Sequence, residues 1–235
     1  MSRSIVSLAV AASLLAACTS SRPVDAPVAR NLTWFSYVGG DDIRAACAPG
    51  AAERYRLVYN GVYTEQVRSY DVQALPSHEG ALMEVRVRGP ARIAGVRLSA
   101  PLVPWTPELS RRWLKQFELE ALVGALETSG VFEPAPIALM LRSGAFYWVI
   151  AACRGGAFHL NAFLHPSPRF DRLRFLPILN RLDPSDIAFN PPRKLDRPPP
   201  LPGQCTSRRH VSDECLFPPF LLTLGDGRLV GGGAL

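Results

Sequence analysis

Residues 53–72, ERYRLVYNGVYTEQVRSYDV, limit the range of folds strongly, because two β-rich runs flank Asn60-Gly61. Asn-Gly is the dipeptide most typical of a two-residue turn between antiparallel strands. If these two residues form the loop, Arg56 faces Glu65 across the strands, and the opposite charges support this register. We therefore expect a β-hairpin here, with its tyrosines in the core of an antiparallel sheet.

A further strand is predicted over residues 81–89, ALMEVRVRG. Val85 and Val87 alternate there with polar side chains, and this two-residue period is typical of a strand that is buried on one face only. The opposite face carries Arg86 and Arg88. We expect these two arginines to be exposed, which makes them candidate binding residues for an anion or a polysaccharide.

A helix is predicted to start at residues 106–108, Thr-Pro-Glu. Thr is a favourable N-cap, Pro fits the first helical position, and Glu suits the first turn. Ser129-Gly130 gives the helix a C-terminal end. Apolar side chains recur at four-residue intervals along this segment, at Leu109, Trp113, Phe117 and Ala121. We expect the helix to cover one face of the sheet, with this stripe in the core.

The remaining sequence combines further β-like runs with one helical segment. The predicted strands are residues 92–99, 137–142, 145–153 and 158–164, and residues 221–230 predict a hairpin. Residues 169–182 predict a helix that Pro177 either kinks or starts. The pattern as a whole predicts an α+β fold, mainly antiparallel sheet packed by one or two helices, with a disulfide-stapled C-terminal tail.

The N-terminus has the organisation of a secretory signal sequence. Arg3 is followed by 13 mostly apolar residues, which are too few to cross a bilayer as a helix. The stretch LAAC, residues 15–18, then resembles the lipobox of bacterial lipoproteins. The resemblance implies that residues 1–17 are removed and that Cys18 becomes the lipidated N-terminal residue. Thr19 implies sorting to the outer membrane, on the side that faces the periplasm.

These predictions divide the chain into five parts. They are a lipoprotein signal peptide (1–17), the lipidated cysteine and a tether (18–31), an α+β domain (32–189), a Pro-rich linker (190–204), and a disulfide loop with a C-terminal tail (205–235). Several acyl chains on one residue hold a protein durably at a bilayer. The membrane is therefore the first expected partner, through the lipid on Cys18.

Four cysteines besides Cys18 are expected to form two disulfides, because their number is even and the predicted compartment is oxidising. The short loop between Cys205 and Cys215 favours that pairing, which leaves Cys47 with Cys153. No C-x-x-C spacing occurs, so no metal site is predicted. A bridged sulfur has no thiolate, which argues against a thiol nucleophile.

The formal net charge is +6, from 26 Lys and Arg against 20 Asp and Glu. Lys115 and Lys194 are the only lysines, so almost all of the positive charge is arginine. The arginines are scattered and do not form the basic runs typical of nucleic-acid patches. No nucleic-acid partner is therefore predicted.

None of the short catalytic or cofactor-binding motifs that we sought is present, and no cofactor is predicted. His159 and His165 lie six residues apart, on the same side of a strand, where they could form a metal or acid–base site. Residues 113–136 resemble a segment of the auxiliary lipoproteins of ABC-type transport systems, in which an amphipathic helix ends in a Ser-Gly turn before a strand.

We therefore predict a non-catalytic binding or interaction module of the cell envelope, with another envelope protein as a candidate partner. Two alternatives stay open from the sequence. One is a periplasmic hydrolase whose active site is assembled in space and is not visible in the sequence. The other is an anion or polysaccharide binder that uses Arg86 and Arg88.

Overall fold

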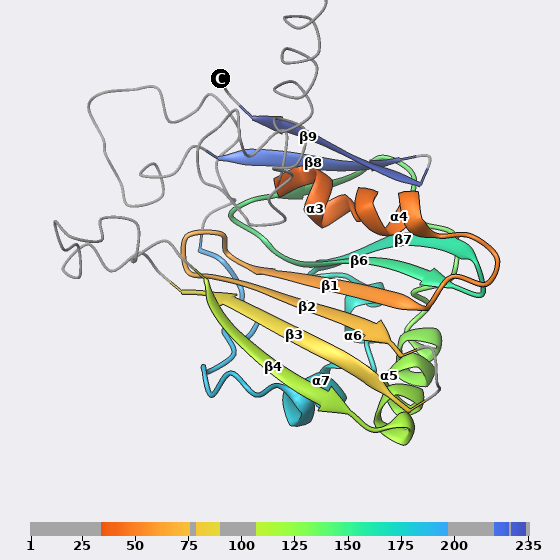
Figure 1. The fold of residues 1–235 in the computed structure, drawn as a ribbon. Helices are drawn as coiled ribbons and strands as arrows, with labels where there is room; N and C mark the ends of the chain where they lie inside the picture. Colours follow the sequence, from red (N-terminus) through yellow and green to blue (C-terminus); the bar gives the residue numbers. More distant parts are fainter. Residues whose placement is uncertain (1–33, 76–78, 90–106, 197–218, 226, 234–235) are drawn as a thin grey trace, which may run out of the picture.

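The structure is a computed structural model that describes residues 34–75, 79–89, 107–196, 219–225 and 227–233. Within these residues, two antiparallel sheets form the framework of the molecule (Figure 1). The larger sheet has the order β4-β3-β2-β1-β6-β7 and the smaller sheet has the order β5-β8-β9.

The strands of the larger sheet are β1 (Arg54–Gly61), β2 (Gln66–Ala74), β3 (Ala81–Arg88), β4 (Glu108–Leu114), β6 (Phe146–Arg154) and β7 (Ala157–His165). Those of the smaller sheet are β5 (Leu139–Arg142), β8 (Phe220–Gly225) and β9 (Arg228–Gly233). The described helices are α3 (Phe35–Gly39), α4 (Asp41–Ala46), α5 (Gln116–Thr128), α6 (Pro168–Asp171) and α7 (Leu176–Leu182).

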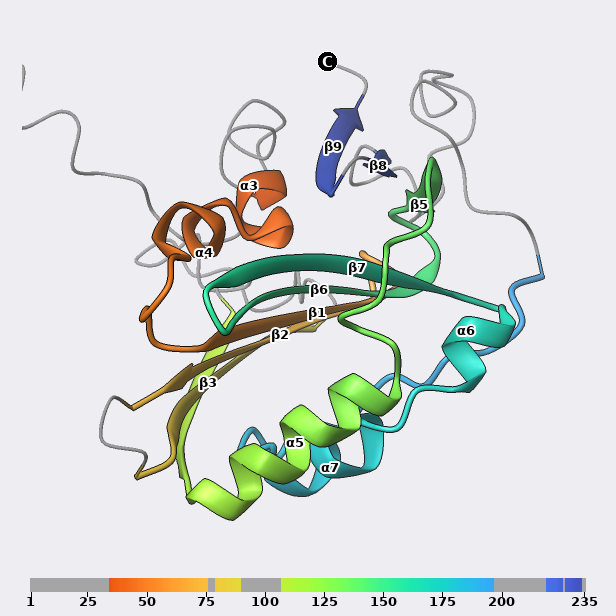
Figure 2. The same cartoon turned by 90° about the vertical axis from the view of Figure 1, so that its right-hand side faces the viewer.

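The elements are arranged in layers about the larger sheet (Figure 2). Helices α5, α6 and α7 lie on one face, and α3, α4 and the smaller sheet lie on the other. Antiparallel sheets with a few helices packed on them confirm the expected α+β class.

Both faces of the central strands are buried. In β1, Tyr55 and Leu57 point towards the helices α5 and α7, whereas Val58 points towards α3 and the smaller sheet. The neighbouring strand β6 alternates in the same way, with Trp148 in the first core and Val149 in the second. A continuous apolar run such as residues 146–153 is typical of a strand with no solvent-exposed face.

The turn predicted at Asn60-Gly61 is wrong, because both residues belong to β1 and the chain turns at residues 62–65. The buried Asn60 amide donates to the carbonyl oxygens of Ser143 and Ala145, at 2.8 and 2.6 Å. A contact with a distant segment has thus outweighed the local turn preference of Asn-Gly. Because the turn lies later in the chain, the register between β1 and β2 also differs from the predicted one.

In the observed register, Arg56 pairs with Asp71 instead of Glu65. The pairing of opposite charges across the strands is therefore kept, but with a different partner. The expected core position of the tyrosines is confirmed, since Tyr55, Tyr59 and Tyr70 lie in one buried cluster and Tyr63 lies in the other.

The helix predicted from residues 106–108 starts later than expected. Residues 108–114 form strand β4, and α5 begins at Gln116, where the Glu118 carboxylate accepts a hydrogen bond from the Lys115 backbone at 2.9 Å. A four-residue spacing also fits a strand, because every second residue lies on one face. Pairing with β3 supplies the strand's hydrogen bonds. Trp113 and Phe117 are therefore exposed, at 67% and 63% of their surface, and not in the core.

Other expectations are confirmed. Strands β5, β6 and β7 occupy the predicted runs, α5 ends at Ser129-Gly130, and Pro177 lies in the first turn of α7, so it marks a helix start. The hairpin predicted at residues 221–230 exists as β8 and β9. It pairs with β5 and buries Leu222, so it is part of the folded body and not a loose tail.

A disulfide joins Cys47, after α4, to Cys153 in β6, with their Cα atoms 5.5 Å apart. This confirms one of the two predicted bridges. Cys205 and Cys215, the predicted staple of the C-terminal tail, lie outside the described residues, as do Cys18 and the strand predicted at 92–99. Among the helices that the structure describes, none is long and apolar enough to cross a membrane.

Candidate binding pocket at the junction of the two sheets

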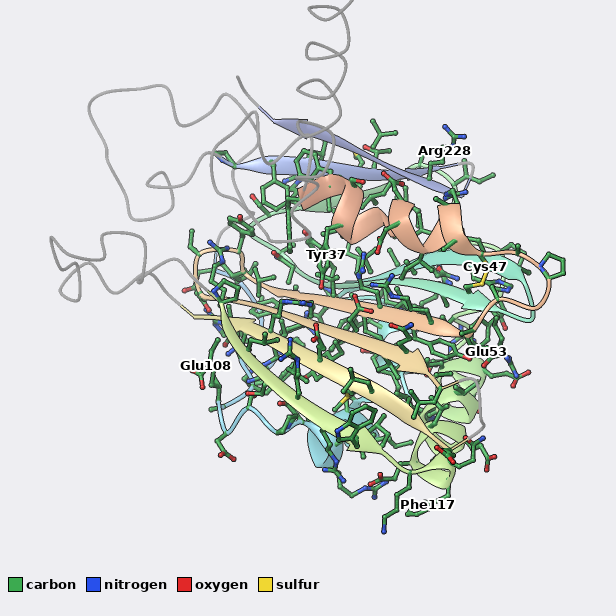
Figure 3. All side chains as sticks on the ribbon, viewed as in Figure 1. Tyr37, Cys47, Glu53, Glu108, Phe117 and Arg228 are labelled. Atoms are coloured by element: carbon green, nitrogen blue, oxygen red, sulfur yellow. A yellow bond between two sulfur atoms is a disulfide. The ribbon has the colours of Figure 1, made fainter. Side chains whose placement is uncertain are left out.

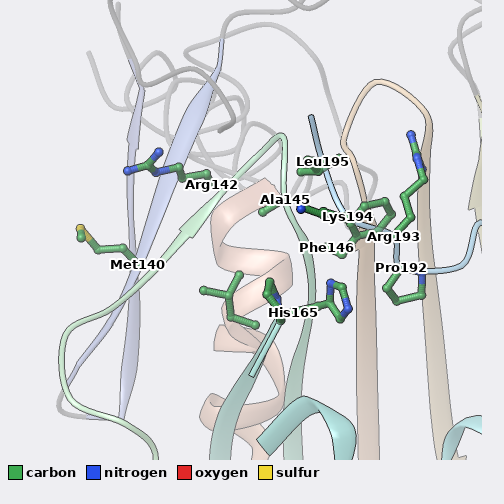
Figure 4. Close-up of a pocket in the computed structure, with 11 residues that line it drawn as sticks. Met140, Arg142, Ala145, Phe146, His165, Pro192, Arg193, Lys194 and Leu195 are labelled. Atoms are coloured by element: carbon green, nitrogen blue, oxygen red, sulfur yellow. The ribbon is translucent and has the colours of Figure 1, made fainter. Parts of the chain in front are cut away.

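A pocket of about 1030 Å³ lies where the ends of β6 and β7 meet β5 and the segment 192–195 (Figure 4). Its lining residues are Met140, Arg142, Ala145, Phe146, Leu164, His165, Pro166, Pro192, Arg193, Lys194 and Leu195. This volume reaches the upper end of the range for small-molecule sites in proteins. The pocket is therefore large enough to hold a ligand with a long apolar part.

The floor of the pocket comes from two paired strands. Phe146 begins β6 and pairs with His165, which ends β7. Their rings are 6.2 Å apart and nearly perpendicular, and His165 also packs against Phe170 at 5.1 Å. The neighbouring Leu164 adds an aliphatic wall. The inner surface is thus mostly carbon.

Three cationic side chains stand around this apolar surface. Arg142 ends β5 on one side, whereas Arg193 and Lys194 come from the segment that faces it (Figure 4). The Arg193 guanidinium binds the Glu65 carboxylate at 2.5 Å and lies 5.2 Å from the centre of the Phe146 ring. Lys194 is exposed and forms no ion pair with any residue that the structure describes. Its ammonium group is therefore available to an anion.

The wall that carries these cations is held by Asn190. Its side-chain amide donates to the carbonyl of Gly61 and to the Glu65 carboxylate, both at 2.8 Å. Its backbone N–H donates to the Gln66 side chain at 3.0 Å, and its carbonyl accepts from the Tyr59 hydroxyl at 2.7 Å. The start of the predicted linker is thus bound to the β1–β2 turn. These hydrogen bonds therefore fix the segment that carries Arg193 and Lys194 on the folded body.

The arginines predicted as a binding pair, Arg86 and Arg88, already have protein partners. Arg86 forms an ion pair with Glu84 at 2.7 Å. Arg88 is buried, donates to the carbonyl of Tyr63 at 2.8 Å, and stacks 3.9 Å from the centre of that ring. These contacts stabilise the sheet edge, so the candidate anion site lies at the pocket instead.

A second group of charges is buried under α4. Arg56, at 1% exposure, binds Asp42 and Asp71, each at 2.6 Å, and also donates to the backbone carbonyl of Tyr37 at 3.0 Å. Burial alone would raise the pKa of Asp71, but Arg56 and Arg54 outweigh it and hold that pKa below its ordinary value. Every charge in this group is paired, so its role is to fasten the helix to the sheet.

The two histidines of β7 do not converge. They share one face, but six residues of strand place them roughly 20 Å apart. His159 packs against Phe132, and its pKa is lowered by burial and by the nearby Arg154. Only His165 reaches the pocket. No three His, Cys, Asp or Glu residues form a metal-binding group within the described parts of the chain, while His78 and His210 lie outside them.

Sequence reasoning did not identify the pocket residues. The adjacent pair Arg193-Lys194 after Pro192 was a usable signal, because it is a local concentration of positive charge directly after a rigid extended stretch. Arg142 carried no such signal. A scan of protein-family models, a search of curated proteins and a search of solved structures each found no match to this chain.

Proposed function

We propose that this protein is a non-catalytic binding module of the cell envelope, which holds an anionic amphiphile in the pocket between its two sheets. The observation that supports this function is an apolar pocket of about 1030 Å³ with cationic side chains from two separate segments. An acyl chain would lie against Leu164 and Leu195, and a carboxylate or phosphate would bind Lys194.

The two parts of such a ligand need different surroundings. Removing apolar surface from water contributes about 25 cal/mol per Å², so an acyl chain gains affinity from the carbon-rich walls. An anionic head group gains from Lys194 at their edge, whereas Arg142 already has a partner within the protein. Glu65 offsets Arg193 in part, which leaves Lys194 as the cation with the most to offer the ligand.

The module is proposed to be attached to the outer membrane by the lipid on Cys18, facing the periplasm. The lipobox-like residues 15–18 and the polar tether up to residue 31 support this placement. Another envelope protein is the proposed partner in delivery or assembly. Binding is favoured over hydrolysis because the described lining of the pocket carries no hydroxyl, thiol or carboxylate beside His165.

The test uses the full-length mature protein and a fluorescent long-chain fatty acid. We expect Lys194→Gln to weaken binding about tenfold, because a hydrogen bond to a charged group contributes about 1.5 kcal/mol. Lys115→Gln is the matched control, since Lys115 lies before α5, on the helical face of the sheet, and does not line the pocket.

The alcohol of the same chain length should bind both variants equally, because it carries no charge for Lys194 to bind. Equal affinity of the wild type and Lys194→Gln for the fatty acid would contradict the proposed site. Absence of any saturable binding would contradict the proposed function.

A further inference from the structure

The outer face of the smaller sheet is apolar and exposed. Met140 of β5, Thr223 of β8 and Val230 of β9 form one row across it. Met140 and Val230 expose 55% and 65% of their surface, and Ile137, just before β5, exposes 85%. The opposite face of the same strands is buried in the core. Exposed apolar residues grouped in this way mark an interaction surface.

The charged residues within the three strands are all positive, while Asp226, between β8 and β9 in the chain, lies outside the described residues. Arg142 and Arg228 lie at the ends of β5 and β9, and none of the three strands contains an acidic residue. Apolar side chains flanked by arginines suit a lipid surface, where the apolar groups enter the interface and the cations meet phosphates. This charge pattern is the first reason to assign the face to a lipid surface.

The path of the chain gives a second reason. The described residues begin at Trp34, and the next residue, Phe35, packs against the buried face of the smaller sheet, with its ring 5.5 Å from that of Phe220 and in the space that a side chain at Gly231 would take. The segment between Cys18 and Trp34 therefore joins the fold in the layer beneath this sheet, on the same side of the larger sheet. Its 16 residues reach at most about 55 Å when extended.

The helical side of the larger sheet also carries an exposed aromatic residue, Phe117. Phe117, on α5, lies on the far side of the larger sheet from Arg228 on β9 (Figure 3). Phe117 is exposed, and the Lys115 ammonium group lies 5.9 Å from the centre of its ring. It provides an exposed reference position on the opposite side of the larger sheet.

We propose that the outer face of the smaller sheet lies on the bilayer, with Ile137, Met140 and Val230 at the level of the lipid head groups. This rests on the proposed anchor at Cys18. The pocket shares Met140 and Arg142 with this face, so its opening faces the lipid and an amphiphile enters it directly from the membrane.

The experiment places a nitroxide label on the full-length lipidated protein in vesicles of phosphatidylethanolamine and phosphatidylglycerol. Labels are attached through Val230→Cys, Met140→Cys or Ile137→Cys, each at an exposed side chain, in a background that carries Cys205→Ser and Cys215→Ser. Phe117→Cys is the matched control. Collisions with oxygen and with a water-soluble nickel chelate are then measured by electron paramagnetic resonance.

We expect the three labels on the small sheet to collide several-fold less with nickel than the label at position 117, and several-fold more with oxygen. Nickel collisions equal to those at position 117, in protein that stays with the vesicles, would overturn the proposal and leave the anchor intact. Shielding from both reagents would also overturn it, since the face would then be covered by protein.

Protein that lacks the lipid by mass spectrometry and does not float with the vesicles would overturn both the anchor and the orientation. The three positions are independent, so one variant that fails to fold does not remove the test.

Discussion

At the scale of single residues, the fold depends on charges that are buried and paired. Arg56 is in effect completely buried, and such a cation is tolerated only because Asp71 and Asp42 bind it. Cross-strand pairing extends the same row from Asp71 to Glu84 and then to Arg111. The order along the row is basic, acidic, acidic, basic, so the two acidic residues at its centre are flanked by arginines.

We expect Asp71→Asn to lower the free energy of unfolding at pH 7 by about 3 kcal/mol, because it leaves Arg56 with an incomplete set of partners. The folded-state pKa of Asp71 is depressed, so its contribution is fully present above its unfolded pKa of about 4 and is lost as the pH falls towards the lower, folded value. Urea unfolding between pH 7 and pH 2 measures both effects.

The wild type should therefore lose more stability than Asp71→Asn as the pH falls below about 4. Asp171→Asn, at an exposed position of α6, is the control and should follow the wild type. Parallel pH curves for Asp71→Asn and the wild type would show that this carboxylate does not stabilise the fold through its charge.

At the scale of elements, the same spacing of residues was compatible with two structures. Leu109 and Trp113 lie four apart, which fits one side of a helix and also one face of a strand. The segment became β4 because the edge of β3 was available to pair with it. The hairpin of β8 and β9 likewise joins the fold through a partner, β5, that is about 80 residues earlier in the chain.

We expect Leu222→Ala in β8 to lower the free energy of unfolding by about 3 kcal/mol, since Leu222 is fully buried in the core beneath the smaller sheet. Thr223→Ala, the next residue and on the outer face, should change it by less than about 1 kcal/mol. Chemical denaturation of the two variants makes the comparison. Equal, small effects would mean that the hairpin is an appendage, as the predicted tail implied.

At the scale of the whole molecule, the two faces of the larger sheet are covered by different structures. Helices cover one face, and the smaller sheet with α3 covers the other, where the first described residue, Trp34, is also buried (Figure 1). The pocket lies at the border between the two sheets. The proposed attachment, the exposed apolar face of the smaller sheet and the pocket are therefore expected on one side of the protein.

We expect Cys18→Ala to leave the chain uncleaved at this site or to release it from the membrane, because the proposed anchor is the lipid and not apolar protein surface. Membrane fractionation and the mass of the mature protein measure this, with Ser20→Ala as the control. Membrane retention of Cys18→Ala at its normal mature mass would contradict the anchor.

Local patterns in the sequence were sufficient for several parts of the structure. The continuous apolar run of β6 predicted a buried strand, Ser129-Gly130 predicted the end of a helix, and the cysteine count led to the bridge between Cys47 and Cys153. These three features depend either on the preferences of neighbouring residues or on the chemistry of one residue type. Both kinds of information can be read from the sequence alone.

Only the tertiary structure decided the register of β1 with β2, the strand identity of residues 108–114, and the pocket. The register follows from contacts of Asn60 with Ser143 and Ala145, more than 80 positions away. The pocket needs Arg142, at the end of β5, and Lys194, in the segment 192–195, to line the same cavity. Such contacts form when distant segments pack together, because burial and hydrogen bonding between them outweigh the smaller local preferences of turns and helices.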